Sequence, residues 1–162
     1  MNPDRPWLHN YPQGVPAEID PDEYRSIAAV FAASVSRYGD RPAYRNMGKT
    51  LTYAEVDTAS ARFAAYLLGE LGLKKGDRVA LMSPNVPQYV IAYQACAKLG
   101  AIVVQVNPLA PAPEVHHYVK DSGAETLIVM AAFAKGPIDV LKTGDTALRN
   151  VITFQVPSGA VE

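Results

Sequence analysis

The sequence predicts an α/β fold: a mostly parallel sheet in three layers with helices on both faces, preceded by a proline-rich arm and a short hairpin. Several short runs are apolar throughout rather than alternating, which indicates strands that are covered on both faces. Between these runs lie segments with helical spacing, proline near the start and glycine at the end. Strands and helices that alternate in this way favour a parallel sheet.

The composition indicates one globular domain. The chain has 162 residues, of which 49% are hydrophobic and 19% charged, and its net charge is −1. A chain of this length can bury a core without disulfides or a structural metal. The single cysteine, Cys96, lies in an apolar run and is expected to be a buried thiol. Because clustered Lys and Arg are lacking, nucleic acid is not an expected partner.

The first 25 residues are expected to form an extended arm with little regular structure, since they contain Pro3, Pro6, Pro12, Pro16 and Pro21. No basic stretch followed by an apolar one is found there, so no secretory signal is expected and a cytoplasmic location is the default. The apolar region 79–113 is broken by prolines, so no transmembrane segment is expected either.

Local signals then predict the elements in order. Apolar residues at helical spacing predict a helix after Ser26, with Gly39 as its left-handed C-terminal cap. Runs at 43–47 and 50–53 predict a hairpin. Thr52-Tyr53-Ala54-Glu55 matches a capping box, which predicts a helix that continues to Gly72.

The remaining elements repeat one pattern. Strands are predicted at 78–83, 101–106, 126–130 and 151–154, and helices at 90–99, around 113–119 and at 139–148. Asn85 is the expected N-cap of the first of these helices, with Pro87 in its first turn. Ligands bind such sheets beyond the carboxyl ends of the strands, which here are the turns Ser83-Pro84-Asn85 and Asn107-Pro108-Leu109.

The glycines do not form a phosphate-binding or dinucleotide motif. Gly48-Lys49-Thr50 resembles the end of a P-loop, but Ala43 stands where that motif needs its first glycine, and the segment lies between two strands. The spacing of Gly69, Gly72 and Gly76 is not that of G-x-G-x-x-G, and helix ends or turns explain them.

Histidines and carboxylates give no catalytic or metal site. His116 and His117 are adjacent on a predicted helix, so they point about 100° apart and are expected to be surface residues. The available carboxylates have no spacing that would pair them around a substrate: Glu114, Asp121, Glu125 and Asp139. The rings of Tyr89 and Tyr93 are expected to pack against the core, with their hydroxyl groups as polar tips. No catalytic, cofactor-binding or metal-binding residue is therefore predicted.

Most of the chain resembles the amino-terminal part of bacterial long-chain fatty-acid CoA ligases, of the AMP-forming adenylating superfamily. The resembling stretches are the opening 5–7 and 18–21, then 46–53, 64–67, 73–85, 88–89, 99–101, 103–109 and 121–125. One departure follows Asn107-Pro108-Leu109, where relatives usually have Tyr-Thr-Pro and this chain has Ala110-Pro111-Ala112. The change removes a Thr N-cap, at a cost of about 1 kcal/mol.

The resemblance implies a ligase that uses ATP and Mg²⁺ to convert a fatty acid to an acyl-adenylate and then transfers the acyl group to CoA. In that family the triphosphate loop, the Mg²⁺-binding Glu, the ribose-binding Asp and the lid Lys come later in the chain. The ending 156–162 has one Ser-Gly pair but cannot cradle a phosphate. Residues 26–162 are therefore interpreted as the N-terminal α/β subdomain, truncated before the phosphate-binding loop.

Three hypotheses follow from these observations. The first is an N-terminal fragment of a fatty-acid CoA ligase that is inactive alone. Its partner is then the rest of the ligase chain, and the full-length relative is cytoplasmic or peripheral at the membrane. The second is a short non-catalytic binding or dimerisation module that self-associates through an exposed apolar patch, at Ile102 to Val106 or on the Tyr89 and Tyr93 face. The third is an unrelated doubly wound domain that binds a nucleotide at the Asn85 and Asn107 turns.

Overall fold

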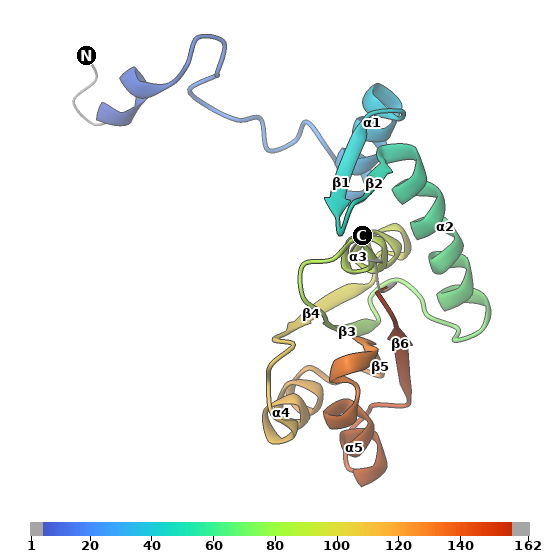
Figure 1. Cartoon of the computed structure of the whole chain (residues 1–162). Coiled ribbons are helices and arrows are strands. Elements are labelled where there is room, and N and C mark those ends of the chain that lie inside the picture. The colour runs from blue at the N-terminus through green and yellow to red at the C-terminus, as the bar shows by residue number, and fades with distance from the viewer. Residues whose placement is uncertain (1–4, 157–162) are drawn as a thin grey trace.

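The amino-terminal arm extends away from the body of the protein (Figure 1). The computed structural model describes residues 5–156, and within the arm it contains one short 3-10 helix, η1 (Pro6–Asn10). Arg5 and Glu18 form an ion pair, and no other helix or strand precedes Ile27 in the described part. The arm is thus almost without regular structure, as its prolines indicate.

The first α-helix, α1 (Ile27–Tyr38), begins where it is predicted. The Ser26 hydroxyl accepts a hydrogen bond from Ala29 N at 3.1 Å. The predicted left-handed cap at Gly39 is wrong, because its φ is −41°. Instead the chain turns directly toward the hairpin, and the Gly39 carbonyl accepts a hydrogen bond from Ala54 N at 3.0 Å. A Cβ at Gly39 would lie 3.1 Å from Val35 O, so the tight turn favours glycine.

An antiparallel hairpin follows, made of β1 (Pro42–Asn46) and β2 (Lys49–Thr52). Its two-residue turn, Met47 and Gly48, has φ values of 47° and 74°. Two successive positive φ values are typical of a tight hairpin turn and exclude a strand-to-helix phosphate loop at Gly48.

The predicted capping box starts α2 (Tyr53–Gly69). Glu55 N donates to Thr52 Oγ1 at 3.2 Å, and Thr52 N donates to the Glu55 carboxylate at 2.8 Å. The helix ends at Gly69 rather than at Gly72. Gly72 has a φ of 65°, so it makes the left-handed reversal just beyond the helix, where Leu73 N donates to Leu67 O at 3.0 Å.

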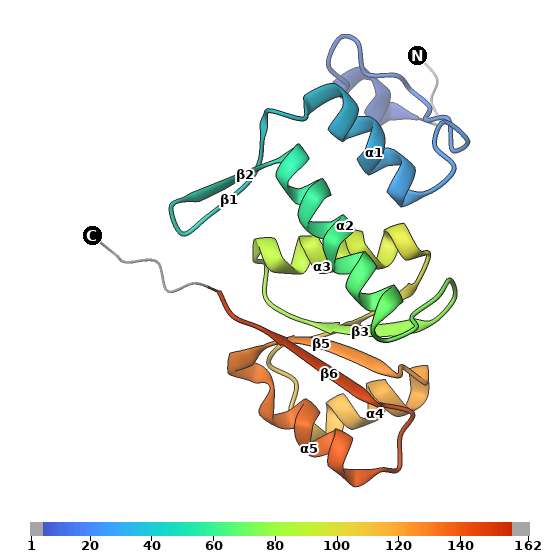
Figure 2. The ribbon, with the colours of Figure 1, turned by 90° about the vertical axis from the view of Figure 1, so that its right-hand side faces the viewer.

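Four parallel strands form the central sheet in the order β4-β3-β5-β6 (Figure 1), and Figure 2 shows β3, β5 and β6 between helices above and below. They are β3 (Arg78–Met82), β4 (Ile102–Val106), β5 (Thr126–Met130) and β6 (Asn150–Phe154). The register is continuous, with Ala80 beside Val104 and Leu127. The two inner strands, β3 and β5, are almost completely buried, as their apolar composition predicts.

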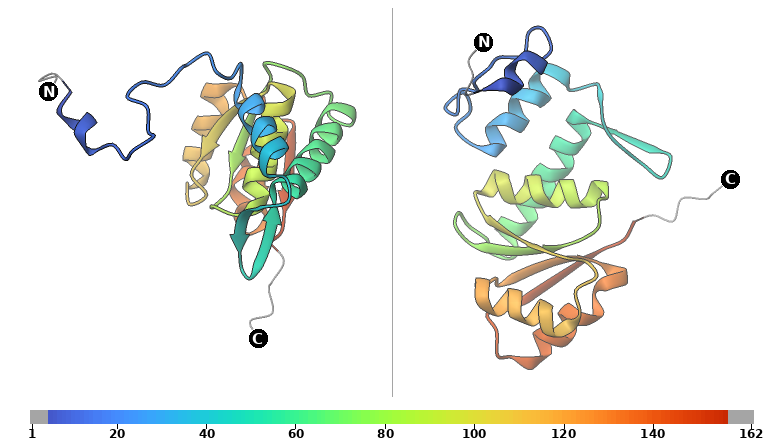
Figure 3. Two further views of the ribbon diagram at one scale, coloured as in Figure 1. Left: turned by 90° about the horizontal axis from the view of Figure 1, so that it is seen from above. Right: turned by 90° about the vertical axis from the view of Figure 1, so that its left-hand side faces the viewer.

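Helices cover both faces of the sheet, which confirms the predicted three layers. On one face lie α2 and α3 (Pro87–Leu99), and on the other lie α4 (Ala112–Ser122) and α5 (Lys135–Thr143) (Figure 3). Each inner strand sends alternate side chains into two separate cores: Val79, Leu81 and Ile128 toward α2 and α3, and Ala80, Met82, Leu127 and Val129 toward α4 and α5.

Two helix starts differ from the predicted ones. α3 begins at Pro87 with Val86 as N-cap, and Asn85 makes no cap there. α5 runs from Lys135 to Thr143, after the short 3-10 helix η2 (Ala131–Phe133), instead of from 139 to 148. Gly144, with a φ of 69°, ends α5, so that Leu148 is buried from a loop. None of the helices within residues 5–156 is long and apolar enough to cross a membrane.

Candidate functional site

The carboxyl edge of the sheet has a cavity at each of the two predicted turns. One cavity, of about 280 Å³, lies between the hairpin and the start of α3 and contains Tyr44, Arg45, Asn46, Asn85 and Tyr89 in its lining. The second, of about 390 Å³, lies beyond β3, β4 and β5. Its lining includes Met82, Pro108, Leu109, Phe133, Lys135 and Asp139.

Two polar side chains of these turns, Ser83 and Asn107, form hydrogen bonds within the turns themselves. The Ser83 hydroxyl donates to Pro84 O at 2.8 Å, and Asn107 Oδ1 accepts from Leu109 N at 3.0 Å. In the larger cavity only Lys135 and Asp139 of the lining residues carry charge. This arrangement provides no pair of groups that could act as nucleophile and base.

Two of the helix N-termini at this edge, those of α3 and α4, are poor sites for phosphate. A phosphate site uses free backbone N–H groups and a positive local potential. α3 starts with Pro87, which has no N–H. α4 has Pro111 as N-cap, Pro113 in its first turn and the carboxylate of Glu114 beside them. A donor is thus missing at the start of α3, and at the start of α4 donors are missing and a negative charge is present where an anion would have to bind.

The predicted carboxylates are not brought together. Glu114 accepts a hydrogen bond from the Tyr118 hydroxyl at 2.6 Å, and Glu125 lies 3.7 Å from Arg149. Asp139 lines the larger cavity, and Asp121 is exposed on α4. Among the described residues no three His, Cys, Asp or Glu side chains are placed to hold a metal ion.

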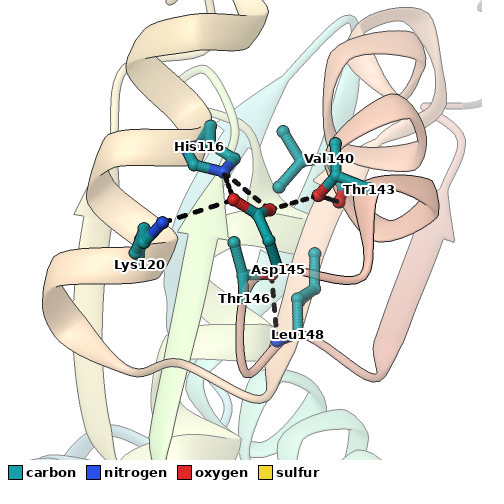
Figure 4. Close-up of polar contacts among 7 residues, drawn as sticks. All are labelled: His116, Lys120, Val140, Thr143, Asp145, Thr146 and Leu148. Atoms are coloured by element: carbon teal, nitrogen blue, oxygen red, sulfur yellow. Dashed lines mark hydrogen bonds and ion pairs between the residues drawn. The ribbon is translucent and has the colours of Figure 1, made fainter.

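His116 takes part in a polar cluster that the sequence analysis missed. Its Nε2 lies 2.8 and 2.9 Å from the two carboxylate oxygens of Asp145 (Figure 4). Asp145 also accepts from the Thr143 hydroxyl at 2.5 Å and from Lys120 Nζ at 3.3 Å. The hydrogen bonds from Thr143 and His116 hold the pKa of Asp145 well below its usual value. Figure 4 shows that the cluster joins α4 to the end of α5, and Figure 2 shows these two helices on the side of the sheet away from α2 and α3.

Two other predicted residues are structural. Cys96 is fully buried, as expected, and burial raises the pKa of its thiol to about 11. Tyr89 and Tyr93 stack with ring centroids 6.3 Å apart and pack against the core below α3, which agrees with their expected packing role.

An apolar groove lies on the other side of α3, next to the edge strand β6. We refer to it as the β6 groove; its volume is about 270 Å³ and its lining residues are Phe63, Gln88, Ile91, Ala92, Ile128, Ile152, Thr153 and Phe154. Helical spacing predicted some of these lining residues, such as Phe63, to be core residues. It did not indicate that a groove would remain between them and β6.

Comparison with known proteins places the chain in a family. The model of the AMP-binding enzyme family matches residues 31–158. This chain belongs to the AMP-binding enzyme family. The resemblance to the adenylating superfamily is thereby confirmed, and the hypothesis of an unrelated doubly wound domain is wrong.

Fatty-acid CoA ligases are among the most similar members of the AMP-binding family. A long-chain-fatty-acid CoA ligase of Escherichia coli is 49% identical over 128 residues, which are 79% of this chain and 23% of the relative. The long-chain-fatty-acid CoA ligase of Bacillus subtilis is 37% identical over 130 residues, which are 80% of this chain and 23% of that ligase. The chain thus spans about a quarter of the length of these ligases.

Solved structures agree with the family and the fold. The N-terminal domain of FACL13 from Mycobacterium tuberculosis superposes with a TM-score of 0.71 at 30% identity, over 80% of this chain and 34% of that one. A long-chain-fatty-acid-CoA ligase from Archaeoglobus fulgidus has a TM-score of 0.74 at 24% identity, over 89% of this chain and 30% of that one, and shows the shared fold.

The ligase resemblance implies ATP, Mg²⁺ and CoA for the full-length relative. Within residues 5–156 no three metal-ligating side chains come together, and the N-terminus of α4 disfavours phosphate because of its prolines and Glu114. The Ser158-Gly159 pair considered for phosphate lies outside the described residues. No reaction step is assigned to residues 5–156.

Proposed function

We propose that this chain is the N-terminal α/β subdomain of a fatty-acid CoA ligase, with residues 1–25 as an arm and 26–162 as the subdomain. The observation that carries the proposal is its 49% identity to a long-chain-fatty-acid CoA ligase over only 23% of that ligase's length. The whole enzyme would react a fatty acid with ATP to form an acyl-adenylate and pyrophosphate, and the CoA thiol would then displace AMP to form a thioester. It would work in the cytoplasm or at the membrane surface.

In this proposal the subdomain alone is inactive and contributes structure. Electrostatic stabilisation of the transferring groups needs donors that point at the developing charge. At the carboxyl edge of the sheet α3 and α4 have prolines at their starts, and Ser83 and Asn107 form hydrogen bonds within their own turns. The remainder of the ligase chain is its partner and would bring the groups for ATP, Mg²⁺ and CoA.

The test compares the 162-residue chain alone with a fusion of the same chain to the part of the Escherichia coli ligase that follows its matched residues. Each protein is incubated with ATP, Mg²⁺, CoA and a long-chain fatty acid, and the acyl-CoA product and AMP are measured. Product from the fusion and none from the chain alone is the expected result. Thioester formation by the chain alone, or a folded but inactive fusion, would contradict the proposal.

A second candidate, a non-catalytic binding or dimerisation module, is favoured by exposed apolar side chains on the arm and α1. Trp7 is 51% exposed, Ile19 85% and Ile27 58%. The patch expected at 102–106 is broken, since Ile102 is half exposed but Val106 is buried. Sedimentation velocity of the chain distinguishes the two candidates: a stable discrete dimer supports the module, whereas a monomer or indefinite aggregation does not.

A further inference from the structure

The end of α1 and the hairpin of β1 and β2 form a basic region in a chain that is otherwise acidic. Residues 37–52 contain the cations Arg37, Arg41, Arg45 and Lys49 and the single carboxylate of Asp40, so their net charge is +3, whereas that of the whole chain is −1. All four cations are exposed, and none of them forms an ion pair within residues 5–156. An excess of unpaired positive charge on one element favours a negatively charged partner.

Two of these arginines are held over one aromatic ring. The guanidinium carbon of Arg37 lies 5.2 Å from the centroid of the Tyr38 ring, and that of Arg41 lies 5.3 Å from it. The cation–π contacts hold both positive charges where the chain passes from α1 into the hairpin. Because a ring, unlike a carboxylate, does not neutralise them, both charges stay available to an anion from outside.

The tip of the hairpin, residues 45–49, is apolar at its turn. Met47 has a φ of 47°, the only positive φ of a non-glycine residue within residues 5–156, and its side chain is 67% exposed. Asn and Gly are the residues that such a turn favours, so the backbone conformation and the exposure to water both disfavour a methionine here. Figure 2 shows the hairpin projecting from the rest of the protein with its turn outermost. The tip therefore presents an apolar side chain where other parts of the described chain do not cover it.

Two cations flank Met47 on opposite faces of the hairpin. In the ladder of β1 and β2, Arg45 is paired with Thr50, and Asn46 is paired with Lys49. Because successive residues of a strand point to opposite faces, the side chains of Arg45 and Lys49 lie on opposite faces of the hairpin. A folded protein partner contacts one face, whereas the headgroups of a bilayer can surround both. This arrangement favours a lipid surface.

We propose that the hairpin tip binds the surface of a bilayer that contains anionic phospholipids. The Met47 side chain enters the boundary between headgroups and acyl chains, and Arg45 and Lys49 contact the phosphates around it. The amino-terminal arm is not assigned this role although Trp7 is exposed, because residues 5–24 contain four carboxylates and one arginine and are repelled by such a surface. The inference goes beyond the proposed function, since it needs no substrate.

Co-sedimentation of the 162-residue chain with lipid vesicles tests the charges. The chain is expected to bind vesicles made of equal parts of phosphatidylglycerol and phosphatidylcholine, and to bind pure phosphatidylcholine about tenfold or more weakly. Arg45→Gln combined with Lys49→Gln should weaken binding to the anionic vesicles about tenfold or more. Arg62→Gln combined with Lys142→Gln removes two exposed cations outside the hairpin and should weaken it by less than about twofold. Equal effects of the two double variants would overturn the inference.

A matched pair of apolar variants tests the turn. Met47→Asn removes the apolar side chain and introduces a residue that tolerates the left-handed backbone, so the hairpin is expected to stay folded by circular dichroism. It should weaken vesicle binding about threefold or more. Leu109 is 77% exposed outside the hairpin, and Leu109→Asn is expected to leave binding unchanged. A parent-like affinity of the Met47→Asn variant would contradict the proposed insertion.

Fluorescence identifies the part of the chain that meets the lipid. Trp7 is the single tryptophan, so Trp7→Phe combined with Met47→Trp reports on the tip alone. Its emission should shift to shorter wavelength on anionic vesicles and be quenched by brominated lipids. An unshifted emission, or loss of binding in Trp7→Ser, would overturn the inference. Equally strong binding of soluble polyglutamate by the parent and Met47→Asn chains, without vesicle binding, would identify an acidic protein as the partner and would overturn it too.

Vesicle binding and activity separate the two proposals. An active fusion, of the kind described above, that does not bind anionic vesicles overturns the membrane contact and leaves the proposed function standing. A fusion that binds the vesicles through the hairpin tip and forms no acyl-CoA supports the membrane contact and counts against the proposed function.

Discussion

His116 Nε2 lies 2.8 Å from Oδ1 of Asp145, although 29 positions separate the two residues in the chain. The contact connects the middle of α4 with the loop that follows α5, and Lys120 and Thr143 complete it. It therefore fixes how the two helices of one sheet face lie relative to each other.

The first prediction concerns the stability of the protein in acid. Because the pKa of Asp145 is lower in the folded state than its usual value near 3.8, its ionised form stabilises the fold. This contribution is present above pH 4 and is lost as the pH falls further. Asp145→Asn should lower the urea midpoint at pH 6 and differ less from the parent chain at pH 2. Asp121→Asn, on exposed α4 surface, is the control; an equal loss for both variants would contradict the prediction.

The second prediction concerns the N-cap of α4. Pro111 occupies this position with an extended backbone (φ −68°, ψ 158°) and makes no capping hydrogen bond. Glu114 stands at the N3 position of a capping box, so Pro111→Thr should complete one. Pro111→Ala is the reference, because it also removes the proline ring. We expect the Thr variant to unfold with a free energy about 1 kcal/mol higher than the Ala variant, measured by urea denaturation. Equal stabilities would show that the cap does not form.

The third prediction concerns the capping box of α2. Thr52→Ala removes the acceptor for Glu55 N and should lower the free energy of unfolding by about 1 kcal/mol. Thr50→Ala, on an exposed position of β2, is the matched control and is expected to change it by less than about 0.5 kcal/mol. Thermal and urea unfolding of both variants measure the difference, and a larger effect at Thr50 would refute it.

The fourth prediction concerns the reactivity of the single cysteine. Since burial raises the pKa of Cys96 to about 11, only about one thiol in a thousand is ionised at pH 8. A thiol reagent should modify the native chain very slowly and the chain in concentrated urea completely. Rapid stoichiometric modification without denaturant would show that the core under α3 opens readily.

Much of the fold could be predicted because its signals are local. The capping box at Thr52 and Glu55, the glycines at 100 and 123 and the apolar runs of β3 and β5 all hold in the structure. Gly39 is the instructive failure, since a glycine after a helix indicates a left-handed cap only when the chain does not turn directly into a tertiary contact.

The site was harder to predict than the fold. Asp145 carries no local signal of its role, because its partners on α4 lie at least 25 positions away. The openness of the β6 groove depends on which strand lies at the edge, which is set by the strand order and not by the apolar pattern of 150–154. No catalytic residue was predicted in this chain, and the activity assays of the chain alone and of the fusion test that prediction.

The strand order also has a consequence for synthesis on the ribosome. β3 is the first strand of the parallel sheet to be made, and it occupies an inner position. β4 then pairs with one side of β3, β5 pairs with the other side, and β6 pairs with the outer side of β5. Each strand thus meets an edge that already exists when it emerges. The sheet can grow in the order of translation without opening any pairing made before, so early folding intermediates need not be undone.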